Sequence, residues 1–67
     1  MGKFRVIQTF VLLRVRDGSK LDNGDPANNE LPLLGEYHIG QEYKITEINA
    51  RGVAEAVAAN LAIVIPE

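Results

Sequence analysis

Residues 3–16 (KFRVIQTFVLLRVR) form a run rich in β-branched, aromatic and leucine side chains that contains neither glycine nor proline. Both alternation classes of this run are apolar, with Phe4, Val6, Phe10 and Leu12 at even positions and Ile7, Val11, Leu13 and Val15 at odd ones. Such a pattern is typical of a long strand that is covered on both faces or wrapped in a barrel. A helix is disfavoured because β-branched and aromatic side chains lose χ1 freedom against the preceding helical turn.

The small size of the chain limits what it can stabilise alone. With 67 residues and no cysteine, we expect one small domain spanning residues 1–67, without disulfides or a thiolate zinc site. A domain of this size buries only about 60% of its unfolded surface. The composition, 46% hydrophobic and 24% charged, excludes collagen and low-complexity disorder. Oligomerisation or docking onto a larger partner is the remaining common way to gain stability.

A long polar loop is expected over residues 17–35, because Asp17-Gly18, Asn23-Gly24 and Asp25-Pro26 are three turn signals in close succession. A loop of this length in a small domain is usually functional or disordered. Whether it is ordered or binds an ion stays open at this point.

The second half of the chain predicts further short strands. Residues 36–48 read as strand, turn and strand around Gly40-Gln41, and 61–65 read as a closing strand before Pro66. Residues 53–60 (VAEAVAAN) fit either the second arm of a hairpin after the turn at 49–52 or a short helix. We favour the strand, which gives an all-β fold; the alternative is an α+β fold with a short helix at 50–60.

The segment 37–45 (YHIGQEYKI) is similar to the diverging turn of the SH3-like small β-barrels, and 63–66 (IVIP) looks like the closing hydrophobic-Pro segment of that class. The resemblance covers about residues 10–66 and implies an SH3-like barrel of about five strands. The chain has no tryptophan and four aromatic residues, so it lacks the aromatic ladder that binds proline-rich peptides in SH3 domains. The resemblance therefore implies an architecture and no peptide-binding residues.

Catalytic and metal chemistry find little support in this sequence. His38 is the sole histidine and falls on the polar side of its predicted strand, whereas catalysis or metal binding needs convergent partners. Ser19 is the sole serine and has no base nearby in the sequence. If Gly24 took the sixth place of an EF-hand loop, Ser19 and Leu21 would fall at positions one and three, which does not fit the calcium pattern. We expect no enzyme, no cofactor and no metal.

Four of the seven basic residues lie in the N-terminal run, at Lys3, Arg5, Arg14 and Arg16. Odd and even positions of one strand point to opposite faces, so these charges would not line a single groove. The net charge of -2 also opposes polyanion binding. A nucleic acid is therefore not the expected partner. A small nucleic-acid- or regulator-binding domain that uses Arg5, Arg14, Arg16 and Arg51 is the alternative hypothesis.

The leading hypothesis is a non-catalytic small β-barrel that acts as an assembly or interaction module. The strands expected at 4–15 and 61–65 carry more apolar surface than a lone domain needs to cover. The module would be a homo-oligomer or a structural accessory docked on a larger assembly, such as a phage particle. The predicted partner-binding residues are Phe10, Leu12, Leu31, Leu33, Leu61, Ile63 and Ile65. The apolar stretch 6–13 is short, is interrupted by polar residues and lacks a cleavage site. It therefore predicts neither a signal peptide nor a membrane segment, and a cytoplasmic or particle-associated location is expected.

Overall fold

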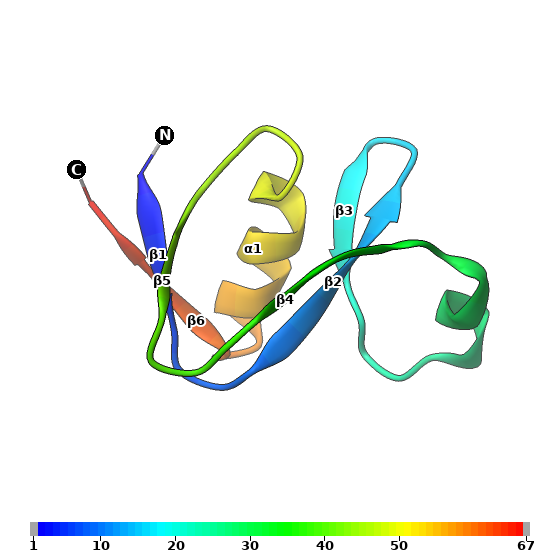
Figure 1. Cartoon of the computed structure of the whole chain (residues 1–67), viewed down its shortest axis with the longest axis horizontal. Coiled ribbons are helices and arrows are strands. Elements are labelled where there is room, and N and C mark those ends of the chain that lie inside the picture. The colour runs from blue at the N-terminus through cyan, green and yellow to red at the C-terminus, as the bar shows by residue number, and fades with distance from the viewer. Residues whose placement is uncertain (1, 67) are drawn as a thin grey trace.

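The computed structural model describes residues 2–66, which form two three-stranded antiparallel sheets and one short α-helix rather than a closed barrel (Figure 1). One sheet has the strand order β5-β1-β6, and the other has the order β3-β2-β4. Helix α1 lies between the two sheets in the view of Figure 1, and the first and last strands, β1 and β6, lie side by side. The elements are β1 (Lys3–Val6), β2 (Phe10–Val15), β3 (Gly18–Leu21), the 3-10 helix η1 (Pro26–Glu30), β4 (Leu33–Tyr37), β5 (Glu42–Lys44), α1 (Ala50–Ala58) and β6 (Ala62–Ile65).

The N-terminal apolar run is two strands instead of the single long strand that the sequence predicts. The chain bends at residues 7–9, so that β1 is the central strand of one sheet and β2 the central strand of the other. A central strand needs apolar side chains over its buried face, and two such strands in succession produce the long run. The prediction of one continuous strand was wrong because two central strands joined by a short bend have the composition of one long strand.

The predicted long loop at 17–35 is also corrected by the structure. Residues 18–21 pair with β2 as strand β3, through a hairpin whose turn residues are Arg16 and Asp17. Gly18, which follows this turn, has φ 131°, a conformation that L side chains rarely adopt. Residues 26–30 form η1, which is capped by the Asp25 side chain. The turn at Asp17-Gly18 is confirmed, but the polar sequence after it concealed a short strand.

The segment 36–48 contains the two predicted strands with altered bounds. β4 ends at Tyr37, a turn with Gly40 at φ 83° follows, and β5 then occupies Glu42–Lys44. The two strands do not pair with each other: β4 pairs with β2 and β5 pairs with β1. This turn and the bend at 7–9 are therefore two places where the chain passes from one sheet to the other.

Helix α1 replaces the strand that we favoured for residues 53–60, so that preference was wrong and the short helix is confirmed. The helix ends in a Schellman motif, in which Leu61 N donates to Ala56 O at 2.8 Å and Asn60 N donates to Val57 O at 3.1 Å. Asn60 adopts the left-handed conformation that this motif requires, with φ 62°. Neither α1 nor any other helix within residues 2–66 has the length and apolarity needed to cross a membrane.

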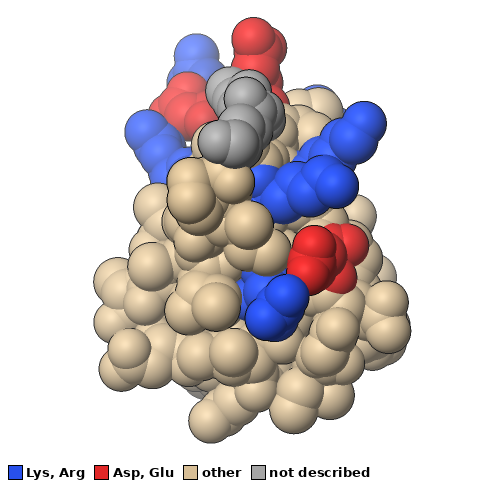
Figure 2. All heavy atoms as spheres, turned by 90° about the vertical axis from the view of Figure 1, so that its left-hand side faces the viewer, with Lys and Arg blue, Asp and Glu red and all other residues tan. Residues whose placement is uncertain are grey.

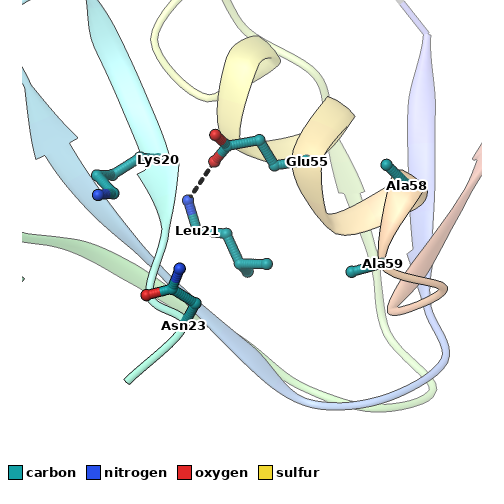
Figure 3. Close-up of a pocket in the computed structure, with 6 residues that line it drawn as sticks. All are labelled: Lys20, Leu21, Asn23, Glu55, Ala58 and Ala59. Atoms are coloured by element: carbon teal, nitrogen blue, oxygen red, sulfur yellow. Dashed lines mark hydrogen bonds between the residues drawn. The ribbon is translucent and has the colours of Figure 1, made fainter. Parts of the chain in front are cut away.

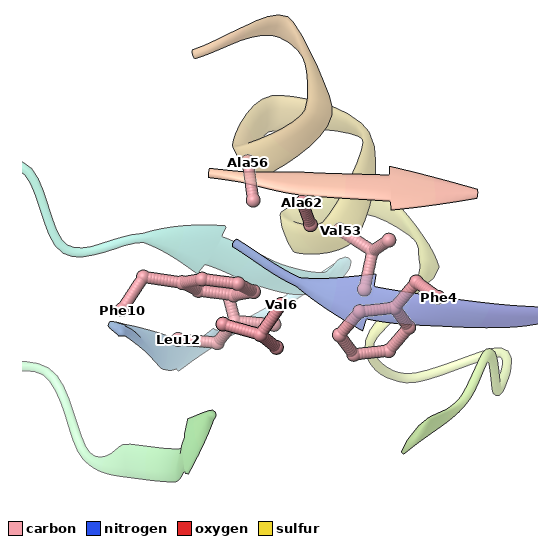
Figure 4. Packing of buried hydrophobic residues seen from close by; sticks show 7 residues of the cluster. All are labelled: Phe4, Val6, Phe10, Leu12, Val53, Ala56 and Ala62. Carbon is pink, nitrogen blue, oxygen red and sulfur yellow. The ribbon is translucent and has the colours of Figure 1, made fainter. Parts of the chain in front are cut away.

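The core joins both sheets to α1 (Figure 4). Its buried apolar residues come from β1, β2, α1 and β6: Phe4, Val6, Phe10, Leu12, Val53, Ala56 and Ala62. All four aromatic rings of the chain meet here, and ring centroids lie 4.9 Å apart for Tyr37 and Tyr43 and 5.3 Å apart for Phe4 and Tyr37. The aromatic residues are thus used to build the core rather than to form an exposed binding ladder.

Candidate interaction surface

Among the described residues 2–66, strand β6 is the last strand of its sheet, and β1 is its single strand neighbour. In the ladder with β1, Ile7 N donates to Leu61 O at 2.9 Å, and Arg5 lies opposite Ile63. Backbone groups of a strand alternate in direction, so those of Ala62 and Val64 point away from β1, toward the free edge.

The free edge of β6 is closed at one end and open at the other. Ala62 is 1% exposed because α1 packs over the start of β6, with Ala56 and Ala62 in the same buried cluster (Figure 4). Val64 is 54% exposed and its neighbour Ile63 is 46% exposed. Pro66, which cannot donate a backbone hydrogen bond, follows the strand. The open part of the edge is therefore the C-terminal half of β6, centred on Val64.

This open edge carries no charged side chain, because β6 has the sequence AIVI. The nearest charges in register are Lys3 and Arg5 on β1, opposite Ile65 and Ile63, and Arg5 Nη2 lies 2.7 Å from Glu42 Oε2 on β5. Figure 2 shows the side of the molecule on which this sheet lies: charged side chains of both signs gather over its upper part, the end toward which β6 runs in Figure 1, and its lowest part is free of them. The open edge itself is therefore apolar, and it is bordered on β1 by Lys3 and by the ion pair of Arg5 with Glu42.

The edge of the other sheet at β3 is treated differently. Helix α1 lies against β3, and Glu55 Oε2 accepts a hydrogen bond from Leu21 N at 2.6 Å (Figure 3). Ser19 is fully buried, and its Oγ accepts from Gly52 N at 3.1 Å in the first turn of the helix. A hollow of about 420 Å³ lies beside this contact, lined by Lys20, Leu21, Asn23, Glu55, Ala58 and Ala59. The Glu55 carboxylate facing this hollow already binds the strand backbone.

The predicted partner-binding residues are scattered over the structure. Phe10 and Leu12 lie in the core, at 5% and 0% exposure, and have no surface for a partner. Leu33 is 59% exposed on β4, in the other sheet from β6, and Leu31 is half-buried before it. The remaining three, Leu61, Ile63 and Ile65, lie together at β6. We therefore keep the β6 group and leave Phe10 and Leu12 out of the contact surface.

The four arginines of the alternative hypothesis do not share one basic surface. Arg5 is paired with Glu42 on the sheet of β1. Arg14 and Arg16 line one hollow of about 400 Å³, but Asp17 and Glu47 line it as well. Arg51 is exposed on α1. Opposite charges stand beside three of the four cations, which weakens the attraction that a phosphate backbone would feel.

The candidate chemical groups are placed mostly in structural roles. His38 is exposed, as predicted, and its Nε2 lies 3.9 Å from Glu36 Oε2. Ser19 lies on strand β3 instead of in a loop. The side-chain oxygens of Asp22, Asn23 and Asp25 each accept a hydrogen bond from the backbone N–H two residues later. Within residues 2–66, no group of three or more His, Asp or Glu is arranged to hold a metal ion.

Sequence reasoning missed Val64, the most exposed residue of β6. In the sequence, alternation places Leu61, Ile63 and Ile65 on one apolar face of the strand and Val64 on the other face. In the structure, Val64 lies opposite Phe4 in the ladder between β6 and β1. Strand order decides the exposure of Val64, because a side chain on the inner face stays partly uncovered when its strand is the last of the sheet. Pro66 is the one signal in the sequence, since proline favours the ends and edges of sheets.

Comparison with known proteins gives no relative: no protein-family model, curated protein or solved structure matches this chain. The function is therefore inferred from the residues and contacts described above.

Proposed function

We propose that this chain is a non-catalytic assembly module that attaches to another protein chain by adding a strand at the open half of the β6 edge. The attached chain is either another copy or a segment of a larger scaffold. The observation that carries the proposal is the combination at Val64 of a free strand edge and an exposed apolar side chain, 54% exposed and without a charge on the same strand.

The chemistry of a strand edge supports this function. The N–H and C=O groups of Val64 point away from β1, and a partner strand can pair with both while covering the apolar side chains beside them. Natural edges that must stay single are commonly protected by lysine, by a bulge, or by a covering helix or loop. The described part of β6 carries none of these at Val64, whereas the β3 edge has a covering helix and a carboxylate.

The roles of the buried polar side chains support a function without catalysis. Ser19 Oγ accepts from the helix at Gly52, and the Asn49 side chain binds backbone groups of both Thr46 and Lys44. These groups fix α1 onto β3 and fix the turn before α1. Both of these side chains bind backbone groups. The third buried polar residue, Asn28, donates from Nδ2 to Asn23 Oδ1, while its own Oδ1 accepts no hydrogen bond; a side-chain amide is neither a nucleophile nor a general base.

The resemblance to the SH3-like small barrels is part of this proposal. It is supported by the turn around Gly40, which has the expected positive φ of a tight bend, and by the hydrophobic-Pro end of β6. The assembly role does not depend on this resemblance, because it follows from the edge of one sheet.

The test is the effect of Val64→Lys on the mass in solution, compared with Ile39→Lys as a matched control. Ile39 is 62% exposed in the turn between β4 and β5, and this turn lies on the β5 side of β1, across that strand from β6. Light scattering over a hundredfold concentration range should show wild type and Ile39→Lys rising above the monomer mass. Val64→Lys should stay monomeric with an unchanged circular dichroism spectrum. A wild-type chain that is monomeric throughout, or a Val64→Lys variant that assembles normally, would contradict self-assembly through this edge.

A further inference from the structure

We propose that the partner at β6 is a second copy of this chain, paired antiparallel across a two-fold axis at Val64. This inference rests on the proposed function and names its partner and register. Two copies would join into one six-stranded sheet of order β5-β1-β6-β6-β1-β5.

The register follows from which backbone groups are reachable. In an antiparallel pair of β6 strands, hydrogen bonds can form only between residues whose groups point outward, which are Ala62 and Val64. Ala62 is 1% exposed under α1, so a register that pairs Ala62 with itself or with Val64 is blocked. The remaining register pairs Val64 with Val64 of the second copy. In this pair the backbone N–H of each Val64 donates to the backbone C=O of the other, which gives two hydrogen bonds across the two-fold axis.

The same register suits the ends of the strand. Residues 62 and 66 lie opposite each other when 64 meets 64. Because α1 covers the edge at Ala62, pairing in this register ends before residue 66, and Pro66 has no backbone N–H that would be left unpaired there. At the other end, Asn60 is left-handed and its N–H already bonds to Val57, so the strand cannot be extended in that direction.

Only apolar side chains meet in this arrangement. Val64 faces Val64 of the second copy on one side of the joined sheet, and Ile63 faces Ile65 on the other, twice by symmetry. The nearest cations in register, Lys3 and Arg5, are one strand further back in each copy. They are then separated across the axis by three strand spacings, about 14 Å, which exceeds the screening length of about 8 Å at physiological salt. Because Glu42 also pairs with Arg5, repulsion between the copies is small.

The joined sheet does not extend beyond two copies, because its outer edges are unsuitable for further pairing. The outermost strand is then β5, with three residues of sequence EYK, and short charged edges resist pairing. The contact itself is small: an edge of this length lies far below the roughly 1,200 Å² of stable complexes. We therefore expect a weak, reversible dimer that forms at high protein concentration.

Cysteine trapping tests the register directly, because the chain contains no cysteine of its own. Val64→Cys places two sulfurs on the axis, where the paired Cα atoms are about 5.5 Å apart, within the range of a disulfide. Ile63→Cys alone should not cross-link, since two copies of position 63 are offset by two residues and lie about 8 Å apart. Ile65→Cys alone should fail for the same reason.

A mixture of Ile63→Cys and Ile65→Cys should cross-link, because positions 63 and 65 face each other across the axis. With one variant labelled with nitrogen-15, mass spectrometry would report a covalent dimer of intermediate mass and almost none of the two symmetric masses. Ile39→Cys, exposed in the turn before β5, gives the background of random collisions. We expect Val64→Cys and the mixture to exceed this background at least tenfold under mild oxidation.

Three results would overturn the inference: cross-linking of Ile63→Cys alone, no trapping of the mixture, or Val64→Cys at the Ile39→Cys background. If light scattering shows assembly that Val64→Lys abolishes while the trapping pattern fails, the register is wrong and the proposed function stands. If neither assembly nor trapping occurs, self-pairing and the self-assembling form of the proposed function fail together.

Discussion

Strands β3 and β6 are both the last strands of three-stranded sheets, but their free edges are treated in opposite ways. At β3, the outward N–H of Leu21 is bound by Glu55 of α1, and the neighbouring Ser19 is fully buried under the same helix. At β6, the outward groups of Val64 have no strand beside them, and its side chain is half exposed. Helix α1 thus covers the whole free edge of β3 in one sheet, but at β6 in the other sheet it covers only the first residue, Ala62.

The geometry of α1 explains this division. Its nine residues span about 13 Å, and the close contact at Gly52 holds its first turn against β3. The Schellman turn at Asn60 then directs the chain straight into β6, so the helix reaches the start of that strand and no further. One close glycine contact therefore holds the helix against the β3 edge and leaves the C-terminal half of the β6 edge uncovered.

The largest effect is expected from Gly52→Ala, which would break the protection of β3. An added Cβ would lie 2.7 Å from Leu12 Cδ2 and 2.8 Å from Ser19 Oγ, so α1 would have to move away from the sheet. We expect a loss of about 2 kcal/mol in the free energy of unfolding, measured by urea denaturation.

The sign of this change is diagnostic, because helix propensity alone would make alanine about 1 kcal/mol more stabilising than glycine. Ala54→Gly, at an exposed position of the same helix, measures the propensity effect in this context. A Gly52→Ala variant as stable as the wild type, or more stable, would show that the helix is not held by close contact.

A smaller effect is expected from Glu55→Ala, which removes the acceptor of Leu21 N. The bond is short, 2.6 Å, but it is partly open to solvent, so we expect a loss of about 1 kcal/mol. Amide exchange at Leu21 should become faster while exchange in β1 is unchanged. Glu47→Ala is the matched control, an exposed carboxylate that does not bind β3, and its effect should stay within about 0.5 kcal/mol. Equal effects of the two variants would mean that Glu55 does not protect the edge.

The smallest effect is expected from Asn60→Gly, which sharpens the comparison at the point where α1 leads into β6. Glycine adopts the observed φ of 62° without steric cost, so we expect a gain of about 0.5 kcal/mol in the free energy of unfolding. Asn60→Ala should instead lose about 1 kcal/mol, because a Cβ disfavours the left-handed conformation. Thermal unfolding of both variants measures the difference. A destabilised Asn60→Gly chain would show that the Asn60 side chain, not its backbone conformation, is what matters.

Local sequence signals predicted the turns and the closing strand but not the assignment of strands to sheets. The turn at Asp17-Gly18 and the strand before Pro66 follow from turn chemistry and β-branched composition. The split of residues 3–16 between two sheets could not be predicted, because alternation continues through the bend and keeps Phe4 and Phe10 on the core side. The helix at 50–58 was underrated: alanine content and Asn60 as a stop signal both favoured it.

The candidate site was predicted in part. Ile63 and Ile65 were identified from the terminal apolar strand, but Val64 was not, because its exposure depends on β6 being an edge strand. Phe10 and Leu12 were included because a strand that is apolar on both faces suggests surplus surface. In the structure that surface is covered by the core, which is filled from both sheets.

Residue-resolved amide exchange at Leu21 and Val64, measured in a dilute and in a concentrated sample, tests the comparison most directly. The account predicts that Leu21 is protected equally in both samples, because its partner is Glu55 of the same chain. The Val64 amide should exchange freely when the protein is dilute and become protected when it is concentrated. A Val64 amide that is already protected in the dilute sample, or that stays unprotected at the highest concentration, would contradict an open edge that pairs with a second copy.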